Sequence, residues 1–403
     1  MAIKHFEFNN QKLYIQGTPI DRLAQRVGST PFYFYDRHLI GKRIAEIKDK
    51  LSKNFCLHYA VKANPMPALI CFLSRLVDGF DVASAGELQL ALDSGMAAEN
   101  ISFAGPGKTD AELRQAVAAG ILVNVESLNE MYRISQIGLD ANVQPRVALR
   151  LNPDFEMKQS GMKMGGGAKP FGIDSELLPS VVEVALKLGI NIEGVHIFSG
   201  SQSLQASSII HAQQQSVALL CKMKRYFTSD LKTINLGGGF GIPYFENDME
   251  IDLDELSAGL NECGEKIKNE FQNSKIVLEL GRFLVGEAGV YIAKVIDKKK
   301  SRGKTFLVLD GGMNHHLAAS GNLGQVIKRN FPVVIANKAF LKEKEIVSIV
   351  GPLCTPLDTL GSDVEVSVCE IGDYVAIFQS GAYGLTASPQ DFLGHPIIKE
   401  VLI

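Results

Sequence analysis

The sequence predicts an α/β protein, a (β/α)8 TIM barrel followed by a second domain that is mainly β. Short β-branched runs alternate with longer helical patterns, the alternation repeats eight times, and it stops near residue 285. A doubly wound open sheet also alternates strands and helices, but it rarely reaches eight parallel strands with polar residues at so many strand ends. We therefore expect a barrel.

The expected barrel strands are short apolar runs, and they lie at residues 55–62, 79–83, 101–105, 121–126, 146–151, 193–198, 233–238 and 275–280. Between them lie helical stretches such as TDAELRQAVAAG and SELLPSVVEVALKLG. Several of these stretches open on Ser, Thr or Asp and close on Gly, as capped helices do. One strand followed by one helix is the repeating unit of a TIM barrel.

After residue 285 the pattern changes to strands separated by turns, in VYIAKVIDKKK, KTFLVLD, VEVSVCE and DYVAIFQ. The first 30 residues read as a hairpin and not as a barrel strand. We therefore expect the barrel at residues 31–285, and a β-barrel domain formed by residues 1–30 and 286–403.

Composition indicates an ordinary soluble chain, with 403 residues, 46% hydrophobic residues and a net charge of -3. This charge predicts neither a nucleic-acid nor a membrane partner. The N-terminus lacks the apolar run of a signal peptide, and no stretch has the length of a transmembrane helix, so we expect a cytoplasmic protein. The six cysteines show no C-x-x-C spacing, and we expect no metal site.

Lys62 lies in YAVKANP, where the first barrel strand ends. Active sites of TIM barrels form at this end of the strands. A lysine that is partly dehydrated there can present a neutral amine to an aldehyde and form a Schiff base, which is pyridoxal phosphate chemistry. A single lysine at a strand end more often extends into solvent, so the other strand ends decide between these two interpretations.

Glycines follow the seventh and eighth strands. Gly237, Gly238 and Gly239 lie in GGGFG, and ELGR adds Gly281 and Arg282. Glycine lets the backbone approach an anion and direct its N–H groups toward it. A GGGFG string by itself is usually only a flexible turn, but the loops after strands seven and eight commonly hold phosphate in this fold. The two strings together predict a phosphate site.

Glu279 stands at the end of the eighth strand. Such a carboxylate is often part of a structural ion pair, yet a pyridoxal phosphate site requires a partner for the pyridine nitrogen. A glutamate keeps this nitrogen protonated, so electrons released at the substrate Cα flow into the ring, which suits decarboxylation. A racemase of this fold is expected to have an arginine there. Glu279 therefore favours a decarboxylase.

His196 follows the sixth strand in HIFSGSQ, and it can be a core histidine or can stack on a cofactor ring. Ser199 and Ser201 can offer hydroxyl groups to phosphate, and which of them does so is left open. Asp81 ends the second strand and is a further candidate for cofactor binding.

Eight strings in order, YAVKANP, GFDVASAGEL, HIFSGSQ, NLGGGFGIPY, ELGRFLVGEAG, DGGMN, GPLCTPLD and GAYG, resemble the motifs of the fold-type III pyridoxal-phosphate-dependent decarboxylases, which include the diaminopimelate, ornithine and arginine enzymes. The resemblance runs from about residue 30 to the C-terminus. It implies an alanine-racemase-like barrel with a β-barrel domain, pyridoxal 5'-phosphate as cofactor, and a head-to-tail homodimer with shared active sites.

The resemblance also implies residue roles. Lys62 would carry the cofactor, His196 would stack on its ring and Glu279 would bind the pyridine nitrogen. Cys354 from the partner subunit would reprotonate Cα, and a thiol with an ordinary pKa near 8.5 is a neutral donor at working pH. Asp358 would support this loop. The phosphate would be held by Gly238, Gly239, Gly281, Arg282 and Tyr383.

The substrate positions depart from the family pattern. Diaminopimelate decarboxylases have glutamate after the cysteine and ornithine decarboxylases have aspartate, which holds the distal ammonium, whereas this chain has Thr355. After DGGMN the arginine that grips a distal carboxylate is missing, and His315 and His316 follow instead. Thr355, Asp358, His315 and His316 are the candidate substrate contacts.

The segment NHHLAASGNLGQVIKRN resembles a subgroup linked to carrier-protein-bound amino acids, such as glutamyl carrier-protein decarboxylases, and to exosortase-associated clusters. This resemblance implies a carrier-tethered L-glutamyl substrate and an acyl carrier protein as partner. The alternative is the decarboxylation of free meso-diaminopimelate to lysine. A racemase and a non-catalytic pyridoxal phosphate carrier are less favoured.

Overall fold

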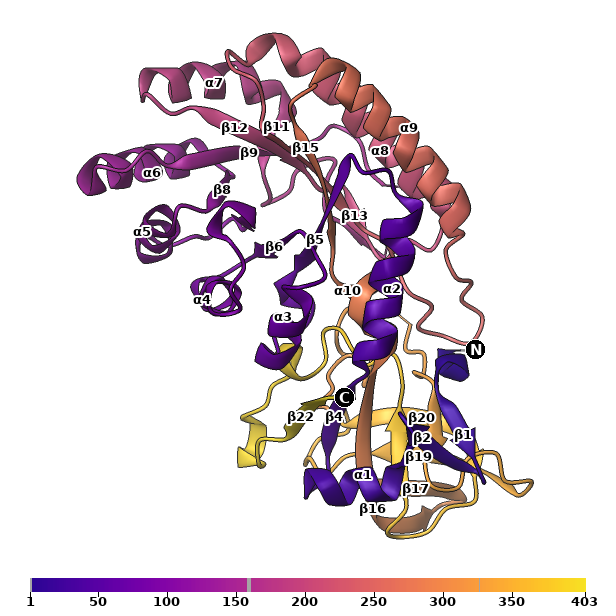
Figure 1. The fold of residues 1–403 in the computed structure, drawn as a ribbon. Coiled ribbons are helices and arrows are strands. Elements are labelled where there is room, and N and C mark those ends of the chain that lie inside the picture. Colours follow the sequence, from indigo (N-terminus) through magenta and orange to yellow (C-terminus); the bar gives the residue numbers. More distant parts are fainter. Residues whose placement is uncertain (1, 158–160, 326) are drawn as a thin grey trace. The chain divides into compact units, whose positions relative to one another are not determined.

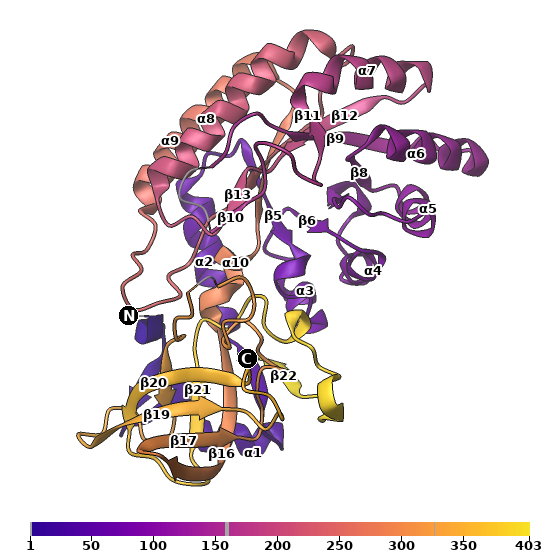
Figure 2. The same cartoon turned by 180° about the vertical axis from the view of Figure 1, so that it is seen from behind.

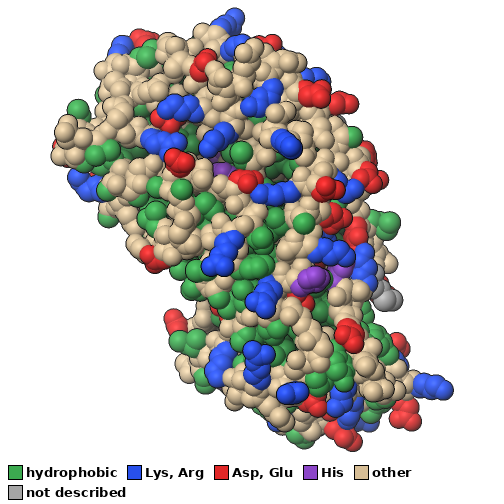
Figure 3. Space-filling model, in the orientation of Figure 1, with side chains coloured by type: hydrophobic (Ala, Val, Ile, Leu, Met, Phe, Trp, Pro, Cys, Tyr) green, Lys and Arg blue, Asp and Glu red, His purple; other side chains and the backbone are tan. Residues whose placement is uncertain are grey.

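The computed structural model describes residues 2–157, 161–325 and 327–403 (Figure 1). The chain forms two compact units. The barrel unit comprises Lys42–Ile242 and Glu250–Leu284, and the β unit comprises Met1–Gly41, Pro243–Met249 and Val285–Ile403. No described helix has the length and apolar character needed to cross a membrane. On the face shown in Figure 3, basic and acidic side chains are interspersed.

Eight parallel strands close into a barrel within the described residues, because β8 pairs with β9. In barrel order these strands are β9 (Arg146–Asn152), β12 (Ile192–Ile197), β14 (Thr233–Gly238), β15 (Lys275–Leu280), β5 (Phe55–Ala60), β6 (Gly79–Val82), β7 (Ile101–Phe103) and β8 (Leu122–Val125). They coincide with the strands expected from the sequence to within a few residues. The prediction of a TIM barrel is confirmed.

Helices lie on the outside of these strands (Figure 2). They are α2 (Arg37–Lys50), α3 (Pro67–Leu73), α4 (Ala85–Asp93), α5 (Asp110–Ala119), α6 (Leu128–Ala141), α7 (Leu178–Lys187), α8 (Ala206–Met223) and α9 (Leu253–Glu270). The short α10 (Arg282–Val285) follows the C-terminal end of β15. Polar residues fix several N-termini, as expected. The Thr109 side chain accepts from the backbone of Glu112, which caps Thr109 in return, and Ser84, Ser127 and Asp252 also cap helices.

The β unit contains the mainly β architecture that the sequence predicts. Its sheet has the order β18-β21-β16-β17-β19-β20, and β4 (Phe32–Tyr35) pairs with both β16 and β22. The other strands are β16 (Gly289–Ser301), β17 (Lys304–Leu309), β18 (Val333–Ile335), β19 (Lys344–Val350), β20 (Thr359–Ser367), β21 (Tyr374–Ile377) and β22 (Lys399–Leu402). β4 lies inside the range expected for the barrel, and its four residues are buried because strands flank it on both sides.

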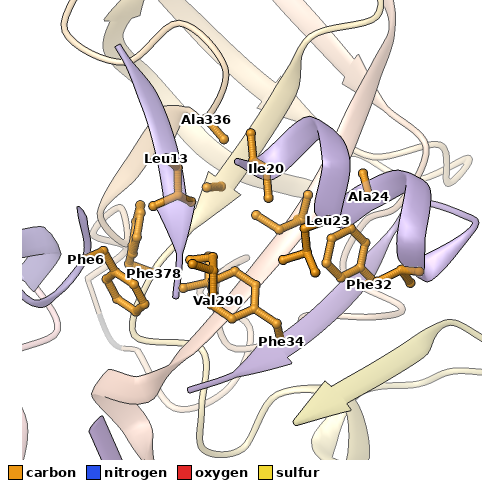
Figure 4. Packing of buried hydrophobic residues seen from close by; sticks show 14 residues of the cluster. Phe6, Leu13, Ile20, Leu23, Ala24, Phe32, Phe34, Val290, Ala336 and Phe378 are labelled. Atoms are coloured by element: carbon orange, nitrogen blue, oxygen red, sulfur yellow. The ribbon is translucent and has the colours of Figure 1, made fainter. Parts of the chain in front are cut away.

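The N-terminal segment forms β1 (Glu7–Asn9), β2 (Lys12–Ile15), β3 (Thr18–Pro19) and α1 (Ile20–Val27). It packs into the β unit, since the Leu13 N–H donates to the Ala336 carbonyl at 2.7 Å. Side chains from this segment and from β4, β16 and β21 form one apolar cluster (Figure 4), whose members include Phe6, Leu13, Ile20, Leu23, Phe32, Phe34, Val290 and Phe378.

His316 is buried inside the β unit. Its Nε2 lies 2.8 Å from the Ser380 hydroxyl, and its ring contacts the aromatic rings of Tyr33, Tyr291 and Phe331. Burial lowers the pKa of His316 to about 3. For His315, whose side chain is also buried, burial lowers the pKa to about 4. Both imidazoles are therefore neutral near pH 7.

The buried His316 predicts a loss of stability in mild acid. Its pKa is lower in the folded chain than the ordinary value near 6.5, so the unfolded chain binds more protons, and the free energy of unfolding falls as the pH drops below about 6.5. His316→Gln keeps an amide donor for Ser380 but does not titrate. We expect its free energy of unfolding to fall by about 2 kcal/mol less than that of the wild type between pH 7 and pH 5. Denaturant unfolding measures this difference, and parallel pH profiles would contradict it.

Candidate active site

Three side chains that the sequence singles out meet at the C-terminal end of the barrel strands. Lys62 lies in the turn after β5, His196 near the end of β12 and Glu279 near the end of β15. Lys62 Nζ is 3.3 Å from Glu279 Oε1, and His196 Nε2 is 3.3 Å from Glu279 Oε2. The Glu279 carboxylate therefore lies between two basic groups.

The three members differ in their access to solvent. His196 and Glu279 are buried, whereas the Lys62 side chain is 44% exposed. This exposure differs from the dehydrated lysine expected from the sequence, so burial does not account for a reactive amine here. Lys62 is positioned instead by Glu279 and by the Phe198 ring, whose centroid is 5.5 Å from Nζ.

Glu279 is ionised despite its burial. Burial by itself raises the pKa of this carboxyl group, but the charge of Lys62, the contact with His196 and the charge of Arg150 together lower it well below its usual range. The carboxylate is thus a permanent negative charge that can face a protonated ring nitrogen.

The His196 ring has unmet hydrogen-bonding capacity. Both of its nitrogens are buried and lack a well-directed hydrogen bond within the described part of the chain. The distance of 3.3 Å to Glu279 supports an electrostatic contact, but the angles do not support a hydrogen bond. A buried polar atom without a partner is uncommon in proteins and fits a site that receives a bound group.

The glycine loops approach other backbone segments too closely for a side chain. A Cβ atom on Gly238 would lie 2.2 Å from a backbone oxygen of β15, and one on Gly239 would lie 2.3 Å from the Gly200 oxygen. A Cβ atom on Gly281 would lie 2.9 Å from the Ala63 side chain. Gly239 also has a φ of +86°, which disfavours other residues. These loops form a backbone cradle of the kind that binds phosphate.

Ser199 and Ser201 flank this cradle. Ser199 is buried, and Ser201 belongs to the short strand β13 (Gly200–Ser201), which pairs with β10 (Met162–Lys163). Ser203, which the sequence analysis did not single out, fixes the glycine loop directly. Its N–H donates to the Gly239 carbonyl at 3.0 Å, and its carbonyl accepts from the Gly241 N–H at 2.8 Å. It belongs to the same SGSQS string, which was the available signal.

Asp81 lies within the barrel beside His58. Its Oδ2 is 3.3 Å from His58 Nδ1, and its Oδ1 accepts a hydrogen bond from the Ser102 hydroxyl. The Ser102 hydroxyl thus fixes one oxygen of this carboxylate, and His58 lies near the other without a well-directed hydrogen bond. A contact between Asp81 and the cofactor stays a prediction.

A buried ion-pair network beside the site was missed from the sequence. Arg150 Nη1 donates to Glu126 Oε1 at 2.9 Å, and Glu126 also accepts from the backbone of Gly105 and Gly172. Burial raises the pKa of Glu126, but the nearby Arg150 and Lys108 charges lower it overall. The available signal was a charged residue at the end of strands four and five.

Lys108 continues this network. Its side chain is 1% exposed, and Nζ donates to Glu130 at 2.7 Å and to the carbonyls of Gly105 and Asn124 at 2.8 Å. Such complete pairing is what a buried ammonium requires. The network holds the Arg150 guanidinium in place, and its positive charge acts on Glu279.

Arg282 begins α10 in the barrel unit, and the remaining predicted residues belong to the β unit. Asp358 is buried and accepts from the backbone N–H groups of Met313 at 2.6 Å and Leu353 at 2.8 Å, so it joins DGGMN to GPLC. Cys354 is exposed beside it. Tyr383 has a left-handed φ of 54°. The approach of Cys354 and Tyr383 to a cofactor stays a prediction.

Known proteins resemble this chain in sequence and in fold. Residues 37–286 match the family described as "Pyridoxal-dependent decarboxylase, pyridoxal binding domain". The L-glutamyl-[BtrI acyl-carrier protein] decarboxylase of Niallia circulans is 37% identical over 93% of this chain and 88% of its own. The diaminopimelate decarboxylase of Aquifex aeolicus is 34% identical over 99% of this chain and 92% of its own. The solved diaminopimelate decarboxylase of M. jannaschii with L-lysine has a TM-score of 0.90 at 28% identity, covering 100% of this chain and 93% of that one.

The residues present fit the cofactor of this family. Lys62 offers an accessible amine, Glu279 offers an ionised carboxylate, and the glycine loops offer a close backbone approach for an anion. The closed barrel, the mainly β second unit and the match over residues 37–286 are all consistent with this family. This chain therefore belongs to the pyridoxal-phosphate-dependent decarboxylases of the ornithine, diaminopimelate and arginine decarboxylase family.

Proposed function

We propose that this enzyme removes the α-carboxylate of an amino acid whose distal end is attached to an acyl carrier protein, with an L-glutamyl group as the leading candidate. One observation carries the proposal. The GPLCTPLD loop has a single acidic residue, Asp358, and its carboxylate is buried between two backbone N–H groups. A distal ammonium thus finds no counter-charge on this loop.

The other candidate substrate residues carry no charge either. Thr355 has no charge, and its hydroxyl accepts from the Leu357 N–H at 3.3 Å. His315 and His316 are buried, and their lowered pKa values leave them uncharged at neutral pH. His316 in particular is enclosed by aromatic rings, which favours a structural role over a substrate contact. A distal carboxylate likewise finds no cation among these residues.

Two relatives support a substrate with a large distal group. The Niallia circulans protein is named for an L-glutamyl group on an acyl carrier protein. A Staphylococcus aureus relative, 31% identical over 94% of this chain, is named for an alanine unit joined through a carbamoyl group to a hydroxybutanedioate. The diaminopimelate decarboxylases among the relatives make free meso-diaminopimelate the alternative substrate.

Bound pyridoxal 5'-phosphate would supply an aldehyde and an electron-withdrawing ring. We propose that the Lys62 amine binds the aldehyde carbon and that Glu279 keeps a proton on the pyridine nitrogen. His196 would lie against the ring. The exposed Cys354 thiol would donate the proton that replaces the carboxylate at Cα, in the site of a partner subunit. The phosphate would be held by Gly238, Gly239, Gly281, Arg282, Tyr383 and a serine of the pair Ser199 and Ser201.

Lys62→Ala removes the amine, so we expect the variant to lose the visible absorbance of lysine-bound cofactor and to lose turnover while keeping the fold. Absorbance after dialysis, circular dichroism and carbon dioxide release measure the three properties. Lys187→Ala, at an exposed position of α7, is the matched control. A wild-type spectrum in dialysed Lys62→Ala protein would remove Lys62 from this role.

Glu279→Gln keeps the shape of the side chain and removes its charge. A neutral amide does not hold a proton on the ring nitrogen, so we expect the cofactor to stay bound while kcat falls by at least about a hundredfold, the scale of a major electrostatic contribution. Single-turnover kinetics on holoprotein with matched cofactor content measures the effect. A wild-type rate in this variant would contradict the proposed electron-sink role.

The substrate proposal predicts faster carbon dioxide release from carrier-linked L-glutamate than from free meso-diaminopimelate. An unpaired buried ammonium costs several kcal/mol, which corresponds to orders of magnitude in selectivity. Efficient turnover of the free diamino acid by the wild type would instead assign the chain to lysine formation.

A variant pair sharpens this test. Thr355→Glu places a carboxylate directly after Cys354, so it should raise kcat/KM for meso-diaminopimelate above the wild-type value, and Thr355→Ala should not.

A further inference from the structure

Part of the interior of this barrel is polar. TIM barrels usually fill this space with bulky branched side chains. Here the middle of the barrel contains a connected set of polar groups, in which Asn124 Nδ2 donates to the Ser102 hydroxyl at 3.3 Å and that hydroxyl donates to Asp81. His58 Nδ1 lies 3.3 Å from the other Asp81 oxygen. All four side chains are buried.

A cavity of about 200 Å³ adjoins this set, with His58, Ser102 and Asn124 in its lining. It is bounded by residues where the strands begin, including Arg146, Lys232 and Lys275, and therefore lies at the N-terminal end of the barrel, opposite to Lys62. In the barrel interior its lining includes the polar side chains of His58, Ser102, Asn124 and Asn235 beside the apolar Ala148, Val195 and Val277. A water molecule occupies about 30 Å³ in the liquid, so the cavity has room for several.

The polar set lies between the cavity at the N-terminal end of the barrel and Glu279 near the C-terminal end. His58 and Glu279 are partners in the register of the neighbouring strands β5 and β15. Partners on adjacent parallel strands project from the same side of the sheet, about 4.8 Å apart. Glu279 in turn lies 3.3 Å from His196. Polar side chains on neighbouring strands therefore follow one another from the cavity toward the Glu279 carboxylate.

Several buried atoms along this row need a partner. His58 Nδ1, Asp81 Oδ2 and both nitrogens of His196 have no well-directed hydrogen bond within the ranges that the structure describes. Buried polar atoms are almost always bonded to protein or to ordered water. An anion is a poorer occupant of the cavity, because Glu193 already pairs with Arg146 and Lys232 at 3.0 Å each.

We propose that ordered water fills this cavity and, with His58 and Asp81, forms a proton route between the N-terminal face of the barrel and the Glu279–His196 pair. Cys354 would supply the proton that replaces the carboxylate at Cα, so this route serves a different proton, the one that Glu279 would keep on the pyridine nitrogen. The route would let this proton exchange with solvent at the N-terminal end of the barrel while substrate occupies the opposite end, and this role rests on the proposed function.

The test is solvent exchange of imidazole N–H groups, measured by NMR on holoenzyme labelled with ¹⁵N-histidine. His316 is the internal reference, because it is buried in the β unit and bonded to Ser380. We expect the His58 and His196 protons to exchange at least about tenfold faster than the His316 proton. Equal, slow exchange of all three would overturn the proposal.

Cavity-filling variants locate the route. Asn124→Leu replaces a polar side chain of the cavity lining with an apolar one. Ala148→Val adds two methyl groups to the lining and so makes the cavity smaller. Each should slow exchange at His58 and His196 at least about tenfold and leave His316 unchanged. Gln136→Leu on the exposed side of α6 is the matched control. Unchanged exchange at His58 and His196 in a folded cavity-filling variant would exclude this route.

If neither variant folds, a high-resolution crystal structure of the wild-type holoenzyme shows whether the cavity contains ordered water. Ordered water bonded to His58 and Ser102 supports the proposal, and a dry cavity overturns it.

Discussion

The buried, ionised carboxylate of Glu279 is the constraint on which the site depends. An unpaired carboxylate in this position would be too costly to keep charged, and it would take up a proton. Lys62 and His196 remove this cost from two sides, at 3.3 Å each. Each of the three side chains comes from a different barrel strand or the turn after it. The geometry of the closed barrel therefore sets the charge of the carboxylate.

The same constraint explains why polar groups continue beyond these three residues. Arg150 adds positive charge near Glu279, and it needs Glu126 to hold it. Glu126 in turn is fixed by backbone N–H groups and by the charge of the buried Lys108. A barrel core with this many charges gains less from apolar burial than an ordinary core does, so complete pairing takes the place of apolar packing.

Much of the fold could be predicted from the sequence, because β-branched runs and capped helices alternate with a clear period. The strand β4 could not, since FYFY is apolar at every position and a strand buried on both faces has no alternation to read. The positions of Lys62, His196 and Glu279 at strand ends predicted that they share one end of the barrel, and the structure places Glu279 3.3 Å from both Lys62 and His196. The sequence could not show that Lys62 is exposed, that Asp358 is already bonded to two backbone groups, or that Arg150 and Glu126 pair, because these features depend on neighbours that are distant in the sequence.

The protonation state of the cofactor's pyridine nitrogen tests the central claim most directly. An ionised Glu279 beside this nitrogen should keep it protonated at neutral pH, whereas a neutral partner would not. The measurement is the ¹⁵N chemical shift of ring-labelled pyridoxal phosphate bound to the wild-type enzyme. A shift typical of a protonated pyridine, lost in Glu279→Gln, is the predicted result. An unprotonated nitrogen in the wild type would contradict the role of Glu279.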